Sequence, residues 1–131
     1  MADLAASISD LVAGDDYEIT RTITGLPSGY ALNKAWLTVK ASAVDADPGI
    51  FQKAITTSNV DGTGQIGDSG SSDGIGAVRF DLVPADTLLL TPGTAYVYDI
   101  QIRYTNSTLT KVNTPEIGTI TTTRGVTVTT A

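Results

Sequence analysis

The chain has 131 residues, a length that fits one domain able to bury a core of its own. With 41% hydrophobic and 17% charged residues it is too apolar for a disordered chain, and its apolar residues are too evenly spread for a membrane span. A net charge of −6, with only 8 basic residues in no cluster, disfavours nucleic acid and anionic membranes as partners. The absence of cysteine excludes disulfides and thiolate metal sites.

The first 14 residues have two interpretations. Leu4, Ile8 and Leu11 recur at helical spacing, with Gly14 as a stop signal. The alternation around Ile8 also fits an extended segment, which we favour because the rest of the chain offers no partner helix. We therefore expect residues 1–14 to form an N-terminal arm that reaches a neighbouring subunit. This start has neither the basic region nor the apolar stretch of a secretory signal, which predicts synthesis in the cytoplasm.

The rest of the chain, residues 15–131, alternates apolar and polar side chains in short runs separated by Gly and Pro turns. The 21 threonines also favour strands, because β-branched side chains suit a pleated surface. We predict strands over residues 17–24, 35–41, 50–57, 77–83, 95–104, 109–112, 116–123 and 126–130, with a 3₁₀ turn at 84–87. Seven or eight short strands without a long helix predict an all-β antiparallel sandwich.

A run rich in Gly, Ser and Asp, residues 58–76, is predicted to be a long loop, either mobile or ordered by a partner. Within it, residues 67–70 spell Gly-Asp-Ser-Gly, as around the nucleophile of trypsin-like proteases. That serine needs an imidazole base, and the chain contains no histidine. The match therefore does not predict a hydrolase.

Two further patterns in this run predict neither a nucleotide-binding site nor a metal site. Residues 62–67 have the glycine spacing of a dinucleotide-binding loop, but no helical pattern follows to meet a pyrophosphate. Asp61, Asp68 and Asp73 have oxygen ligands suited to calcium, yet their spacing fits no EF-hand and no bidentate Glu accompanies them. We expect no cofactor and no metal site.

Carboxylate catalysis and sugar binding each require a particular arrangement of side chains. Glu18 and Glu116 are the only glutamates, and both fall on predicted strands rather than facing each other across a cleft, so we expect no enzyme. A carbohydrate-binding module would need exposed aromatic rings on one face, with Tyr30, Trp36 and Tyr104 as the candidates. Burial of those rings would disfavour this alternative.

Several segments resemble a known family. They are Trp36-Leu37-Thr38-Val39-Lys40, Val78-Arg79-Phe80-Asp81-Leu82, Asp86-Thr87, residues 92–101 (Pro-Gly-Thr-Ala-Tyr-Val-Tyr-Asp-Ile-Gln), Gly118 and Val126-Thr127-Val128. Together they resemble the immunoglobulin-like domain that opens the phage baseplate upper protein and recurs in other phage structural proteins. The resemblance spans roughly residues 17 to 130 and implies an immunoglobulin-like sandwich. The run at 58–76 is longer and richer in Gly than that family's pattern.

In that family the domain is a docking unit within a larger protein. The resemblance therefore implies a phage virion structural protein that docks onto other virion proteins, in a tail, baseplate or neck, and that we expect to be free-standing and part of a symmetric assembly or homo-oligomer. A capsid decoration protein of the same particle is the alternative. As contact residues we predict Leu4, Ile8, Leu11, Ile66 and Ile75, because each is apolar in a segment that looks poorly placed for the core.

Overall fold

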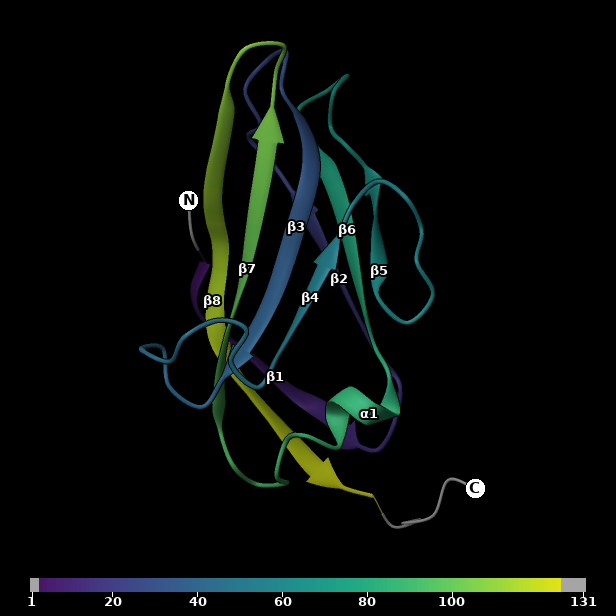
Figure 1. Cartoon of the computed structure of the whole chain (residues 1–131), viewed down its shortest axis with the longest axis vertical. Helices are drawn as coiled ribbons and strands as arrows, with labels where there is room; N and C mark the ends of the chain where they lie inside the picture. Colours follow the sequence, from purple (N-terminus) through teal and green to yellow (C-terminus); the bar gives the residue numbers. More distant parts are fainter. Residues whose placement is uncertain (1–2, 126–131) are drawn as a thin grey trace.

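A computed structural model describes the backbone of residues 3–125 and the side chains of residues 6–125. Within that part the chain forms eight strands and one short helix (Figure 1). They are β1 (Asp3–Ala13), β2 (Tyr17–Ile23), β3 (Ala31–Lys40), β4 (Phe51–Ile55), β5 (Gly64–Asp68), β6 (Gly76–Leu82), α1 (Pro84–Thr87), β7 (Tyr96–Thr105) and β8 (Thr110–Arg124). No helix in the described part is long and apolar enough to cross a membrane.

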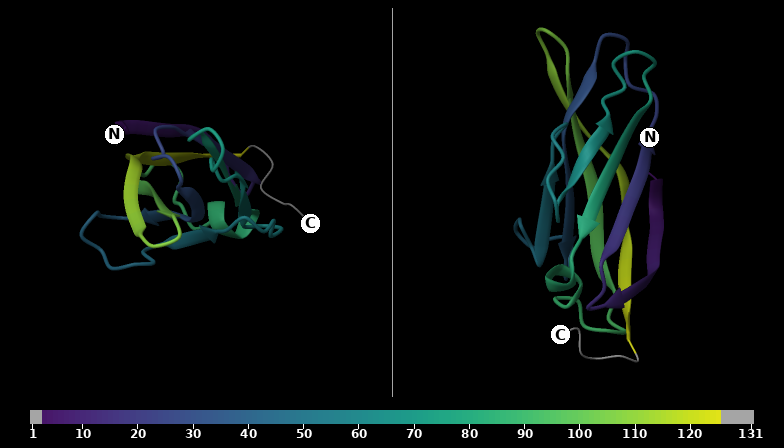
Figure 2. Two further views of the ribbon diagram at one scale, coloured as in Figure 1. Left: turned by 90° about the horizontal axis from the view of Figure 1, so that it is seen from above. Right: turned by 90° about the vertical axis from the view of Figure 1, so that its right-hand side faces the viewer.

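The strands form two layers (Figure 2). One sheet has the order β1-β8-β7-β3-β4 and the other the order β2-β6-β5. This is the order of an immunoglobulin-like sandwich, with β2, β6 and β5 as strands B, E and D, and β8, β7, β3 and β4 as G, F, C and C′. The predicted sandwich is confirmed. It is not purely antiparallel, because β1 runs parallel to β8.

The core lies between the two layers and follows the alternation along each strand. Along β7 every second side chain is buried: Tyr96, Tyr98, Ile100, Ile102 and Tyr104. These are the residues that the sequence places on one face of this strand. The other sheet meets them with the inward side chains of β2 and β6.

The corner between β6 and β7 is held by side chains. The backbone N–H of Thr91 donates to the hydroxyl of Tyr96 at 2.9 Å, the tyrosine corner of immunoglobulin-like sandwiches. The buried hydroxyl of Thr87, in α1, accepts from the N–H of Gly14 and donates to the carbonyl of Asp15, both at 2.9 Å. The one-turn helix therefore anchors the turn between β1 and β2.

The N-terminal segment is a strand of the sheet rather than a free arm. The extended interpretation is confirmed, but residues 3–13 pair with β8 instead of reaching outward. The side chains of Ile8 and Leu11 lie in the core, with 5% and 0% exposed. The backbones of β1 and β8 lie close together here, because a Cβ added to Gly118 would lie 2.2 Å from the carbonyl oxygen of Ala6. Glycine at this position permits the pairing.

The Gly-rich run is not one long loop. Residues 64–68 of the predicted 58–76 loop form β5, the edge strand that pairs with β6. Gly64 has a φ of +131°, and a Cβ there would lie 2.0 Å from the carbonyl oxygen of Arg79. Ile66 then enters the core with 2% exposed. Gly64, one of the glycines that suggested a loop, is needed for close backbone approach, which Gly in a strand often marks.

Strand β8 also differs from expectation. The predicted strands at 109–112 and 116–123 are one strand, and the break between them is a register shift opposite β7. Pro115 lies in this shift. Proline, which has no backbone N–H, is tolerated there because the extra residue of a bulge is left unpaired in the ladder. The predicted closing strand at 126–130 lies outside the described residues.

If β1 is part of the folded unit, Leu11→Ala destabilises the protein. We expect the free energy of unfolding to fall by about 2–5 kcal/mol, because the change leaves a cavity at a fully buried site. Val44→Ala, at a side chain that is 91% exposed, is the control and should change it by less than about 0.5 kcal/mol. Urea denaturation measures both, and equal stability of the two variants would contradict the placement of β1.

Candidate functional site

One side of the sandwich is open, because β1 pairs with only part of the length of β8 in the described chain. The first pair between β1 and β8 joins Asp3 to Glu116. No strand of the described chain therefore pairs with residues 110–115 on the side of β8 that β1 occupies. We call residues 110–115 the free segment of β8. Figure 1 shows β1 beginning partway along β8. The facing edge of the other sheet is β2, which pairs with β6 alone.

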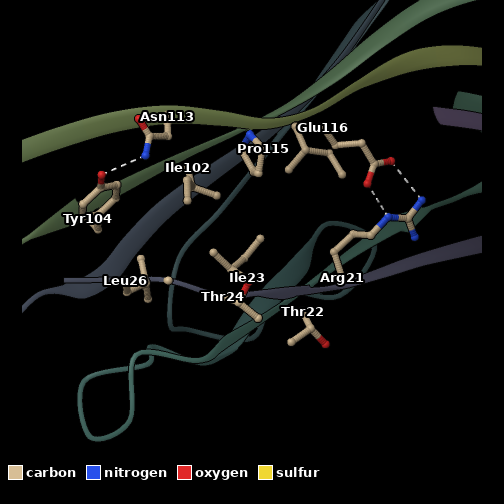
Figure 3. A pocket seen from close by; sticks show the side chains of 12 residues that line it. Arg21, Thr22, Ile23, Thr24, Leu26, Ile102, Tyr104, Asn113, Pro115 and Glu116 are labelled. Carbon is tan, nitrogen blue, oxygen red and sulfur yellow. Dashed lines mark hydrogen bonds and ion pairs between the residues drawn. The ribbon is translucent and has the colours of Figure 1, made fainter. Parts of the chain in front are cut away.

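A groove of about 320 Å³ lies between these two edges. Figure 3 shows its side chains converging from β2 and from β7 and β8. Its apolar middle consists of Ile23, Leu26, Ile100, Ile102 and Pro115. The groove is therefore an unfilled part of the space between the sheets, open to solvent beside the free segment.

An ion pair bridges the two sheets at one end of the groove. Arg21 of β2 donates from Nε to Oε1 of Glu116 at 2.7 Å and from Nη2 to Oε2 at 3.1 Å. The side chains are 34% and 10% exposed. The hydroxyl of Tyr98 also donates to Oε2 of this carboxylate. Both carboxylate oxygens are thus occupied by donors from this chain.

The titration of these groups follows from the contacts. Burial raises the pKa of Glu116, but the hydrogen bonds from Arg21 and Tyr98 outweigh it and hold the pKa below its ordinary 4.5. The hydrogen bond to Glu116 raises the pKa of Arg21. Burial, then the bond to Glu116, raises the pKa of Tyr98 well above its ordinary value. All three keep their usual protonation states at neutral pH, so the cluster suits bridging rather than proton transfer.

The other end of the groove is formed by Tyr104 and Asn113. Nδ2 of Asn113 donates to the hydroxyl of Tyr104 at 2.8 Å, as Figure 3 shows. The ring of Tyr104 packs edge-on against Tyr30 with centroids 5.5 Å apart, and Nζ of Lys111 lies 5.3 Å from the Tyr30 centroid. Both rings are buried. They form no flat exposed platform, which disfavours the carbohydrate-binding alternative.

The third ring of that alternative lies elsewhere. Trp36 is half-buried on the outer face of the five-stranded sheet. Nζ of Lys34 lies 5.3 Å and Cζ of Arg103 lies 5.9 Å from its ring centroid. Two cations therefore lie near this ring, and it does not share a surface with the two buried tyrosines.

The structure does not bring the predicted contact residues together on a surface. Ile8, Leu11 and Ile66 are in the core, so the premise that they were poorly placed for it is wrong. Ile75 is 44% exposed, in the turn before β6. The side chain of Leu4 lies outside the described residues.

The aspartates of the Gly-rich run have local roles. Oδ1 of Asp68 accepts from the N–H of Gly70 at 2.8 Å, and Oδ1 of Asp73 accepts from the N–H of Ile75 at 3.0 Å. Such bonds to the backbone two residues on are typical of Asx turns. In the part of the chain with described side chains, no three acidic residues gather as metal ligands would.

The ion pair is the feature that sequence reasoning missed. A signal existed, since Arg21 shares its strand face with Ile19 and Ile23, and a charge on an inward face needs a partner. The partner, Glu116, is 95 residues away, so no local pattern identifies it. Comparison of the chain with protein-family models, with curated proteins and with solved structures finds no match.

The ion pair predicts a pH-dependent effect of Glu116→Gln. Because the folded-state pKa of Glu116 is below its ordinary 4.5, the charged carboxylate stabilises the fold above that pH and the gain is lost as the pH falls. We expect the variant to lose about 1–3 kcal/mol at pH 7 and to approach the wild type near pH 3.

Glu18→Gln is the matched control, at an exposed carboxylate of β2 with no ion pair among the described side chains. It should shift stability by less than about 0.5 kcal/mol at any pH. Unfolding curves from pH 7 to pH 3 measure both variants. A loss for Glu116→Gln that stays constant across this range would mean that the charge does not contribute.

Proposed function

We propose that this protein is a non-catalytic structural component of a phage virion that docks onto other virion subunits, in a tail, baseplate or neck. The observation that carries the docking role is the free segment of β8 over an unfilled groove. Unpaired strand edges bind extended segments of other chains, and native proteins usually cover or blunt them. Here the edge stays open beside apolar side chains that are suited to contact.

The assignment to a virion is supported by the resemblance of residues 17 to 130 to the immunoglobulin-like domain of phage structural proteins. The strand order and the tyrosine corner at Tyr96 agree with the fold that the resemblance implies. A net charge of −6 suits a position outside the packaged DNA, which would repel an acidic protein.

Other exposed apolar side chains offer further contacts. Val44, in the loop between β3 and β4, is 91% exposed. Leu88 and Leu89, after α1, are 65% and 52% exposed. These residues lie outside the groove, so a subunit docked there would leave them free for a second neighbour. A component held between neighbours needs more than one contact surface.

Co-sedimentation tests this role. The purified protein is mixed with assembled phage particles, with capsids and with separated tails, and we expect it to sediment with particles and tails. Light scattering of the protein alone gives its mass for comparison. Sedimentation with capsids but not tails would indicate the decoration role instead, and no binding to any of the three would contradict a virion role.

A pair of variants tests whether the open edge is used. Val112→Asp places a charge on the free segment and should reduce the bound fraction at least several-fold, because charged side chains on an edge oppose strand pairing. Val44→Asp makes the same change at an exposed loop valine and should leave it unchanged if the edge carries the contact. Circular dichroism confirms that both variants are folded. Equal binding of the two would contradict docking through this edge.

A further inference from the structure

The outer face of the five-stranded sheet carries the single tryptophan of the chain and two exposed aliphatic side chains. Trp36 of β3 is half-buried there. Val112 and Ile117 of β8 are 51% and 42% exposed and pair with outward residues of β7. Tryptophan is enriched among the residues that anchor protein interfaces. This face therefore has the composition of a contact surface.

One end of this face is basic. Lys34 and Arg103 pair across β3 and β7, and both lie beside the ring of Trp36. Nε of Arg103 donates to Oδ1 of Asn33 at 3.1 Å, which positions the guanidinium group. In the part of the chain with described side chains, neither cation forms an ion pair. Both positive charges are therefore available to a partner.

The other end holds a part-buried carboxylate beside a small hollow. Asp99 lies four residues from Arg103 along β7, about 13 Å away at about 3.3 Å per residue. It forms no ion pair with a described cation, and burial raises its pKa, an effect that the charge of Lys40 offsets only in part. The hollow, of about 70 Å³, is bounded by Asp99, Thr38 and Ile117. Because one water needs about 10–15 Å³ of such space, the hollow admits a group the size of a guanidinium.

The strand register arranges the outward side chains of β3, β7 and β8 in rows across the sheet. The basic row consists of Lys34, Arg103 and Val112. The middle row contains Trp36 and Gln101. The acidic row consists of Thr38, Asp99 and Ile117. A two-fold axis through the middle row, perpendicular to the strands, therefore sets the basic row of one copy against the acidic row of another.

This arrangement matches side chains of complementary kind. Arg103 of each copy meets Asp99 of the other, beside the hollow. Val112 meets Ile117, and the two Trp36 rings meet at the axis. The strands of the two sheets stay aligned, as in most face-to-face packing of sheets. We propose that the protein forms a two-fold symmetric dimer through this face, with Arg103 of each copy paired to Asp99 of the other.

A second copy fits this face better than an unrelated chain. An interface between identical patches must be self-complementary, and here the register supplies that property without any further requirement. The net charge of −6 does not prevent the contact. Exposed charges more than about 8 Å apart are largely screened at physiological ionic strength, so the groups in contact decide the outcome. The dimer goes beyond the docking role proposed above and uses a different surface.

The mass and the fluorescence of the protein test the dimer. Sedimentation equilibrium should give twice the mass of one chain. Because Trp36 is the single tryptophan, its emission reports this face alone, and we expect it to shift to shorter wavelength as the protein is concentrated. A protein that stays monomeric, or a dimer without the shift, would overturn the proposal. A monomer whose emission shifts only when phage particles are added would assign the face to another partner and would also overturn it.

Charge reversal tests the symmetry. Arg103→Glu and Asp99→Lys should each weaken the dimer by about tenfold or more, because each places like charges opposite one another twice. An equimolar mixture of the two variants should dimerise again. In the mixed dimer the new glutamate faces the new lysine, and the second contact keeps its original Arg103 and Asp99. This rescue also shows that both variants are folded.

Two variants on other surfaces are the matched controls. Arg124→Glu, at the far end of β8, and Glu18→Lys, on β2 of the other sheet, make the same changes at exposed residues. Both should dimerise like the wild type. A dimer that Arg103→Glu and Asp99→Lys leave intact, or a mixture that stays monomeric, would overturn the two-fold arrangement.

The dimer and the virion role fail separately. A dimer that sediments with no phage particle supports this inference and contradicts the virion role. A monomeric wild-type protein that sediments with tails supports the virion role and overturns the dimer. Val112 belongs to both surfaces, whereas Arg103→Glu leaves the free segment unchanged. Co-sedimentation of Arg103→Glu therefore shows whether a loss in Val112→Asp comes from the edge or from the dimer.

Discussion

The parallel pairing of β1 with β8 determines both how the sandwich closes and where it stays open. It begins at Glu116 and requires Gly118, because any side chain there would collide with the backbone of Ala6. It brings Ile8 and Leu11 into the core. Within the described residues, the same pairing leaves residues 110–115 without a neighbouring strand on one side. A strand that would otherwise be covered along its whole length is therefore covered only in part.

The ion pair between Arg21 and Glu116 lies where the covered and uncovered parts meet. It joins the two sheets with charge-assisted hydrogen bonds instead of apolar packing, and Tyr98 satisfies the carboxylate further. Such a pair costs desolvation, so its net stabilisation is modest while the loss of one partner is expensive. Beside the pair, side chains of β2 and of β7 and β8 face each other across the groove without filling it.

The open edge and the groove make one surface with two kinds of recognition. Under the proposed docking role, backbone groups of the free segment would pair with a partner strand independently of its side chains, and the groove would contact alternate side chains of that strand.

The sequence by itself determined the all-β class, most strands and the inward face of β7, because alternation is a local property that each strand carries alone. It did not reveal β5, whose glycines resemble a loop, or the burial of Ile66. Only the tertiary structure decided that residues 3–13 pair with β8, that Arg21 meets Glu116 and that no described strand covers residues 110–115 beside β1. These facts depend on the register between segments about 100 residues apart. No local period encodes such a register, since it is set by which strands meet when the sheets pack.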